Sequence, residues 1–134
     1  MDLTLSHTFV TVADFDAALA FYRDTLGLEV RTDVGAGAMR WVTLTPPGQP
    51  DVQIVLNPTH AGREADGDTV AALLAKGSLN GVIFRTGDVD AAFERVRATG
   101  AEVLQEPMDT HYGVRDCAFR DPSGNLVRIQ APKG

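Results

Sequence analysis

The chain holds few side chains that could carry out acid–base or nucleophilic chemistry: three histidines and one cysteine. His7 could act as a general base, because imidazole is the side chain whose unperturbed pKa lies near neutrality. The sequence places no nucleophile or orienting carboxylate beside His7, so we favour a polar residue at a strand start, hydrogen-bonded to Gln53. Trp41, the only tryptophan, could stack on a planar ligand or pack in the core, and we favour ligand contact.

No short motif of phosphate-binding loops, zinc proteases, thiol redox sites or serine hydrolases occurs in the sequence. Gly35-Ala36-Gly37 lacks the third glycine and the following helix of a dinucleotide-binding motif, so a hairpin explains it better. The single Cys117 excludes an internal disulfide and is typical of a reducing compartment. We expect this cysteine to be a small buried apolar residue rather than a nucleophile.

The composition is that of an ordinary globular domain, with 44% hydrophobic and 22% charged residues over 134 positions. The net charge of −6 argues against nucleic acid and anionic membranes as partners, since both require clustered basic residues. We find neither an apolar run long enough to span a bilayer nor the pattern of a secretory signal. The composition therefore predicts one cytoplasmic domain, residues 1–134, that acts on a small molecule.

An internal repeat organises this domain. Residues 5–18 resemble residues 79–92 at an offset of 74, and the turn at 46–48 resembles the one at 121–124, with Ile54 matched to Ile129. The identical pairs at that offset are Leu5 and Leu79, Asp14 and Asp88, Asp16 and Asp90, Ala17 and Ala91, and Ala18 and Ala92. We infer a first module at 5–57, a linker at 58–78 and a second module at 79–131.

Both modules show the same order of secondary-structure signals. Alternation over residues 7–12 predicts a strand, and Asp14 is placed to cap a helix with an apolar stripe. Asp88 precedes an equivalent helix, and Gly27 and Gly100 stand where left-handed residues end such helices. Three strands are expected to follow each helix, at 28–34, 38–45 and 51–57 and at 101–106, 113–120 and 125–131. A short helix at 68–76 is expected in the linker.

A βαβββ module repeated twice, with the sequence FYRDTLG at 21–27 and DPSGN at 121–125, resembles the vicinal oxygen chelate superfamily. That superfamily includes lactoylglutathione lyases, extradiol dioxygenases and bleomycin-resistance-type proteins that only bind their drug. The resemblance covers about residues 5–131 and implies an α+β fold, in which two tandem modules form curved mixed sheets around a cavity. It leaves the function open, because one fold can support unrelated chemistries.

The resemblance also implies four metal-ligand positions, on the first and last strand of each module. The matching residues here are His7, Gln53, Gly81 and Arg128. Gly81 has no side chain to offer, and Arg128 is a cation where metalloenzymes of the family place a carboxylate. At about 4 Å a guanidinium would repel a divalent ion by several kcal/mol. We therefore expect no metal and no other cofactor, with His7 and Gln53 as the only fallback ligands.

Strand order in the family, combined with alternation along each strand, predicts which residues face the cavity. Arg128 and Asp116 of that set could anchor a carboxylate or phenolate, form an internal ion pair, or do both. For Arg85 a surface position competes with the cavity, and His111-Tyr112 could be an aromatic lid or an exposed turn. The expected ligand-binding set is Phe9, Met39, Trp41, Gln53, Val55, Arg85, Asp116 and Arg128, with Thr43 on the same face. The opposite face is apolar and should pack on the helices.

The leading hypothesis is a metal-independent binding protein of the glyoxalase/bleomycin-resistance type, whose ligand is planar and partly anionic. The alternative is a metal-dependent lyase, isomerase or dioxygenase that uses His7 and Gln53, with a third ligand such as His111 or a residue of a partner chain. A third hypothesis is a metal-free enzyme with His7 as its base. Since members of the family pair modules within a chain or across a dimer, the resemblance also predicts a homodimer.

Overall fold

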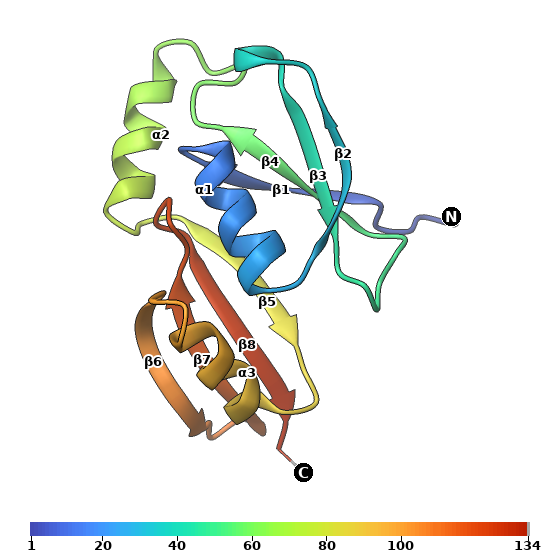
Figure 1. Ribbon diagram of the computed structural model, residues 1–134, viewed down its shortest axis with the longest axis vertical. Helices are drawn as coiled ribbons and strands as arrows, with labels where there is room; N and C mark the ends of the chain where they lie inside the picture. Colours follow the sequence, from blue (N-terminus) through green and yellow to red (C-terminus); the bar gives the residue numbers. More distant parts are fainter. Residues whose placement is uncertain (134) are drawn as a thin grey trace. The chain divides into compact units, whose positions relative to one another are not determined.

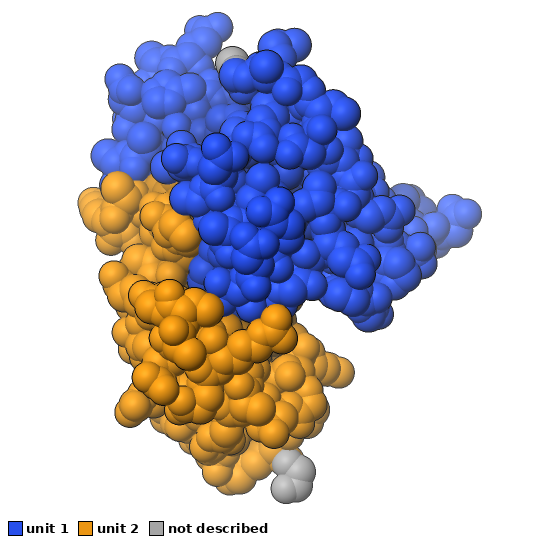
Figure 2. Space-filling view, viewed as in Figure 1, with its two compact units in different colours: residues 1–72 blue, residues 73–134 orange. Residues whose placement is uncertain are grey.

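The computed structural model describes residues 1–133 and contains two four-stranded mixed sheets, each accompanied by helices (Figure 1). The chain divides into two compact units, one covering residues 1–72 and one beginning at Leu73, which Figure 2 shows in different colours. Each unit contains one βαβββ module. The α+β fold with tandem modules is thereby confirmed.

The first unit is a sheet in the order β1-β4-β3-β2. Strand β1 is parallel to β4, whereas the β4–β3 and β3–β2 pairs are antiparallel. Its elements are β1 (His7–Val12), α1 (Phe15–Leu19), a π-helical turn (Ala20–Thr25), β2 (Glu29–Val34), a 3-10 turn (Gly37–Met39), β3 (Trp41–Thr45) and β4 (Gln53–Pro58).

The second unit repeats this arrangement in the order β5-β8-β7-β6, again with one parallel pair, β5–β8. Its elements are β5 (Asn80–Arg85), α3 (Val89–Arg97), β6 (Glu102–Asp109), β7 (Val114–Arg120) and β8 (Leu126–Pro132). Helix α2 (Asp66–Ala75) lies in the linker and begins two residues before the predicted start at 68.

The helix boundaries follow the predicted signals. Asp14 accepts hydrogen bonds from the backbone N–H groups of Asp16 and Ala17, and Asp88 accepts one from that of Ala91. These bonds satisfy donors that have no partner within the first turn of a helix. The left-handed glycines are also present, with φ of 83° at Gly27 and 88° at Gly100. Val89, Phe93 and Val96 form the buried stripe of α3.

Each sheet buries one face against its helix. Helix α1 contacts β4, and α3 contacts β6, β7 and β8. The expected apolar faces are buried on the inner strands, at Ile54 and Leu56 of β4 and at Val127 and Ile129 of β8. On the outer strand β5, Val82 and Phe84 are only half-buried, because an edge strand is covered by fewer neighbours.

The segment before β3 differs from the prediction. A strand was expected from residue 38, but Gly37–Met39 is a 3-10 turn and β3 starts at Trp41. Gly35 and Gly37 have positive φ values of 83° and 56°, which an extended strand does not allow. Strand alternation therefore cannot assign Met39 to a sheet face, and the reason given for placing it in the cavity is wrong.

The strand register corrects the match between the two copies. Thr43 of β3 pairs with Val55, and Ala118 of β7 pairs with Arg128. The counterpart of Arg128 is therefore Val55, whereas Gln53, the expected counterpart, lies two residues earlier on β4. The cause is the β3–β4 connection, residues 46–52, which is two residues longer than the β7–β8 connection, residues 121–125.

Both units contain an ion cluster that the sequence analysis missed. An arginine at or just before the third strand of each module binds one aspartate in the first turn of the helix and one near the end of the second strand. Arg40 contacts Asp16 at 3.2 Å and Asp33 at 2.9 Å, and Arg115 contacts Asp90 at 2.8 Å and Asp109 at 3.1 Å. Hydrogen bonds from these arginines hold the pKa of Asp33 and of Asp90 below the ordinary aspartate value. The duplication of this cluster supports the repeat independently.

Candidate ligand-binding site

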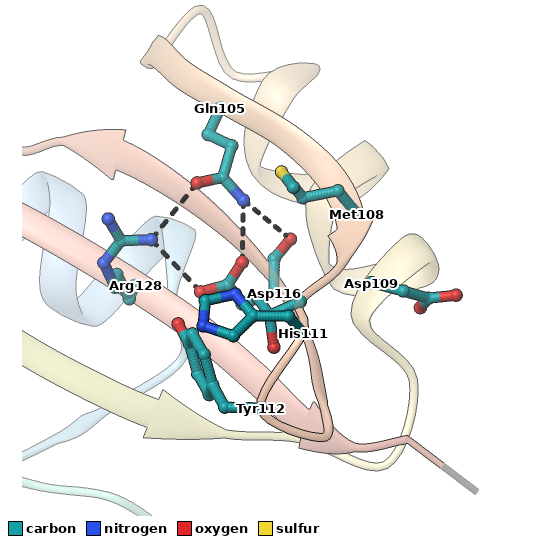
Figure 3. Close-up of a pocket in the computed structure, with 8 residues that line it drawn as sticks. Gln105, Met108, Asp109, His111, Tyr112, Asp116 and Arg128 are labelled. Carbon is teal, nitrogen blue, oxygen red and sulfur yellow. Dashed lines mark hydrogen bonds and ion pairs between the residues drawn. The ribbon is translucent and has the colours of Figure 1, made fainter.

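A cavity of about 460 Å³ lies in the second unit, between the β6–β7 hairpin and the face of β7 and β8 that carries Asp116 and Arg128 (Figure 3). This volume suits a small organic ligand. The lining residues are Gln105, Met108, Asp109, Thr110, His111, Tyr112, Asp116 and Arg128. They come from the second half of β6, from the hairpin loop, and from diagonally related positions on β7 and β8.

An ion pair lies within this cavity. Arg128 Nη1 is 3.1 Å from Asp116 Oδ2, as alternation on β7 and β8 predicted. The Asp116 side chain is 2% exposed, while that of Arg128 is 32% exposed. A buried carboxylate is costly unless it is paired and hydrogen-bonded. Arg128 therefore neutralises Asp116 while part of its guanidinium stays open to the cavity.

Gln105 connects the two charged groups (Figure 3). Its Nε2 donates to Asp116 Oδ1 at 2.7 Å and to the Asp116 backbone carbonyl at 3.2 Å. Its Oε1 accepts from Arg128 Nη1 at 3.2 Å. Alternation could not identify this residue, because the β6–β7 register shifts on both sides of Gln105 and the two-residue period fails across such irregularities.

The rim of the cavity is aromatic and exposed. The rings of His111 and Tyr112 meet edge to face, with centroids 5.1 Å apart. Tyr112 is 64% exposed and Met108 is also exposed. At the rim Asp109 is paired with Arg115 at 3.1 Å and with Lys133 at 3.8 Å. The hairpin tip thus presents two exposed aromatic rings next to the polar groups of Gln105, Asp116 and Arg128.

The other expected site residues lie on different elements. Phe9 on β1 is 62% exposed and Trp41 on β3 is 45% exposed, both in the first unit. Val55 is only 1% exposed, so its side chain is closed to solvent in this structure. Arg85 is exposed on β5 and does not line the cavity described above. Only Asp116 and Arg128 of the expected set are brought together there.

His7 and Gln53 are neighbours in the register of β1 and β4, but each has another partner. His7 Nδ1 lies 2.9 Å from Ser6 Oγ, and Gln53 Oε1 accepts from the Thr43 hydroxyl at 2.8 Å. The expected hydrogen bond between them is replaced by these contacts. Since His7 is exposed at the first residue of its strand, its ring is open to solvent.

The donor set at the four family positions does not fit a metal ion. The Gln53 amide oxygen is engaged by Thr43, and Arg128 is a paired cation. A Cβ at Gly81 would overlap the Leu126 backbone oxygen, so no ligating side chain fits there without a backbone shift. Over residues 1–133 no group of three His, Cys, Asp or Glu side chains is arranged to hold a metal.

Cys117 is fully buried on the opposite side of β7 from Asp116. Burial, and secondarily the negative charge of Asp116, raises the pKa of its thiol to about 11. A neutral thiol is a poor nucleophile.

In the part of the chain that the structure covers, no helix is both long and apolar enough to cross a membrane.

Known proteins share both the sequence pattern and the fold. Residues 4–129 match the family described as the Glyoxalase/Bleomycin resistance protein/Dioxygenase superfamily. The crystal structure of UcmS2 superposes with a TM-score of 0.85 at 36% identity, covering 97% of this chain and 98% of that one. That of TnmS3, an antibiotic binding protein from Streptomyces sp. CB03234, gives a TM-score of 0.74 at 29% identity, covering 98% and 97%.

An enzyme is also among the similar sequences. An ethylmalonyl-CoA/methylmalonyl-CoA epimerase from Cereibacter sphaeroides is 32% identical over an alignment of 109 residues, and the match covers 75% of this chain and 73% of that protein. The family match spans nearly the whole chain and agrees with the tandem βαβββ topology. The protein therefore belongs to the glyoxalase/bleomycin resistance protein/dioxygenase superfamily.

Proposed function

We propose that this protein is a metal-independent small-molecule binding protein whose ligand is planar and carries an oxygen acceptor. The observation that carries the proposal is the second-unit cavity, in which the partly exposed Arg128 guanidinium lies beneath an aromatic rim. Such a combination of apolar walls with a few fixed polar groups is typical of ligand sites. The similarity to TnmS3, an antibiotic binding protein, supports the same function.

The donor chemistry supports metal independence. Arg128 is a cation that cannot ligate, and its counterpart on β4 is Val55, which has no donor atom. His7 alone of the four family positions keeps an imidazole that could bind a metal. One imidazole does not make the three-ligand set of a catalytic metal centre.

We also propose a homodimer. Phe9, Trp41 and Ile83 are large apolar side chains that stand exposed on strands, where a second copy would cover them. Phe9 and Trp41 were also expected to contact the ligand, but neither lines the second-unit cavity. Light scattering coupled to gel filtration should give a mass of about twice 14.3 kDa, and a strictly monomeric protein would contradict the proposal.

Binding is tested by isothermal titration calorimetry with a panel of aromatic acids, aromatic ketones and glycopeptide antibiotics. At least one planar compound should bind with saturable heat, and Tyr112→Ala should weaken that binding about fivefold through lost stacking. A matched control is Tyr22→Phe, which alters a tyrosine buried in the first-unit core and should leave affinity unchanged. Metal-dependent turnover of any panel member would refute a purely binding function.

The second candidate is a metal-dependent enzyme of the same superfamily, a lyase, isomerase or dioxygenase that uses His7 and Gln53. It is favoured by the similarity to a coenzyme A-thioester epimerase. Elemental analysis of protein purified without chelator or added metal distinguishes the two. Stoichiometric metal that is lost in a His7→Ala variant would favour the enzyme, and metal-free protein would favour binding.

A further inference from the structure

Gln105, Asp116 and Arg128 form the polar floor of the second-unit cavity. Their side-chain oxygens all accept hydrogen bonds, whereas some of the N–H donors have no partner within the described part of the chain. Both carboxylate oxygens of Asp116 accept hydrogen bonds, one from Gln105 and one from Arg128. The Gln105 amide uses its oxygen and its nitrogen within the same cluster. The contacts of Arg128 converge on Nη1 (Figure 3), and across residues 1–133 its Nε and Nη2 make no further hydrogen bond. Hence the floor offers donors to a ligand oxygen.

The same floor carries no excess positive charge. Arg128 is neutralised by Asp116 at 3.1 Å, and the other charged lining residue, Asp109, is a carboxylate that is itself paired with Arg115 and Lys133. The chain as a whole has a net charge of −6. An anionic ligand would have to compete with Asp116 for Arg128 in a partly buried site, where charges are poorly screened. A neutral acceptor would use the free N–H groups without that repulsion.

From these two observations we infer that the cavity selects an uncharged planar ligand with a carbonyl-type oxygen, which accepts from Arg128 while its ring lies against His111 and Tyr112. The inference rests on the proposed function and narrows its ligand class. It also amends the sequence-based expectation of a partly anionic ligand, which weighed an Arg128–Asp116 pair but not the contacts of Gln105 with both groups.

Three naphthalene probes of similar shape separate the possibilities. 2-Acetylnaphthalene has a neutral carbonyl acceptor, 2-isopropenylnaphthalene replaces that oxygen by a methylene group, and 2-naphthoate carries a full negative charge at the same position. Backbone amide chemical shifts of the wild-type protein, followed by nuclear magnetic resonance at pH 7.5, give dissociation constants and locate each probe. The acetyl compound should bind about fivefold more tightly than either of the others, the value of one hydrogen bond, with shifts in residues 105–128.

Asp116→Asn changes the charge of the floor while keeping its shape. With Arg128 no longer neutralised, 2-naphthoate should overtake 2-acetylnaphthalene, shifting their affinity ratio about tenfold or more. Glu102→Gln is the matched control, because it removes an exposed carboxylate that pairs with Arg120 at 2.9 Å outside the cavity lining. This control should keep the wild-type order of affinities.

The possible results distinguish failure of the neutral-acceptor inference from failure of the proposed binding function. If wild-type protein binds 2-naphthoate as tightly as the acetyl compound, or binds the isopropenyl compound equally well, the neutral-acceptor inference is overturned while the binding function stands. If none of the probes shifts residues 105–128, the cavity does not bind planar ligands and both fail. The wild-type comparison decides the matter even if Asp116→Asn does not fold.

Discussion

Asp116 Oδ2 and Arg128 Nη1 lie 3.1 Å apart, and the two partners differ in their access to water: the carboxylate is buried and the guanidinium is partly open. Removing the carboxylate and removing the guanidinium should therefore lower the free energy of unfolding by different amounts. Arg128→Met leaves a buried carboxylate with one amide partner and should lower the free energy of unfolding by about 3 kcal/mol. Asp116→Leu leaves a cation that water can reach and should cost about 1–2 kcal/mol. Urea unfolding measures both.

The double variant Asp116→Leu, Arg128→Met tests whether the pair itself stabilises the fold. Because a buried ion pair can be replaced by apolar groups at little cost, its stability should return to within about 1 kcal/mol of wild type. Additive losses in the double variant would contradict this explanation and indicate that Gln105 or the cavity lining depends on the charges.

The Gly81→Ala variant tests the close contact between β5 and β8. An added Cβ would overlap the Leu126 backbone oxygen at the bulge between β5 and β8, so Gly81→Ala should destabilise the protein by about 1–3 kcal/mol. Gly87→Ala is the control, since a Cβ there meets nothing within 4 Å and the change should stay within about 0.5 kcal/mol of wild type. Thermal unfolding of both variants provides the comparison, and equal melting temperatures would refute the predicted clash.

The Arg115 cluster should affect stability in acid. Hydrogen bonding to Arg115 lowers the pKa of Asp90, so below about pH 5 the unfolded chain, with an ordinary aspartate pKa near 3.9, binds more protons than the folded one. Stability contributed by this pair is therefore complete above that range and is lost as pH falls through the folded pKa. In Arg115→Gln the melting temperature should depend less steeply on pH between about 5 and 3.

Arg95→Gln is the matched control for this prediction. Arg95 is an exposed arginine of α3, and among the described residues it forms no ion pair. The substitution removes the same charge, so its pH profile should run parallel to wild type. A profile for Arg95→Gln as flat as that for Arg115→Gln would show that net charge, not the cluster, is responsible.

Cys117 should be unreactive in the folded protein. Its burial raises the thiol pKa to about 11, so at pH 8 almost no thiolate is present and the sulfur is out of reach of reagents. Ellman's reagent should label less than about a tenth of the protein in an hour and all of it in 8 M urea. Rapid labelling without denaturant would show that the β7 segment opens readily.

Local signals in the sequence determined most of the fold. Asp14 and Asp88 cap their helices, and Gly27 and Gly100 end them, because these roles depend on short-range backbone geometry. The repeat predicted two modules of equal topology. The strand was predicted to begin too early, at residue 38, because the two neighbouring glycines with positive φ turn the chain before β3 begins.

The sequence by itself determined the order of helices and strands and the helix caps, since alternation and capping act over a few residues. The shared sheet face of Asp116 and Arg128 followed from alternation together with the strand order that the family resemblance implies. Only the tertiary structure decided that Val55 is the counterpart of Arg128 and that Gln105 joins the ion pair. These contacts depend on loop length and on register shifts between strands, and neither quantity is encoded in the period of a single strand. For that reason, the charge balance of the cavity became visible only in the folded chain.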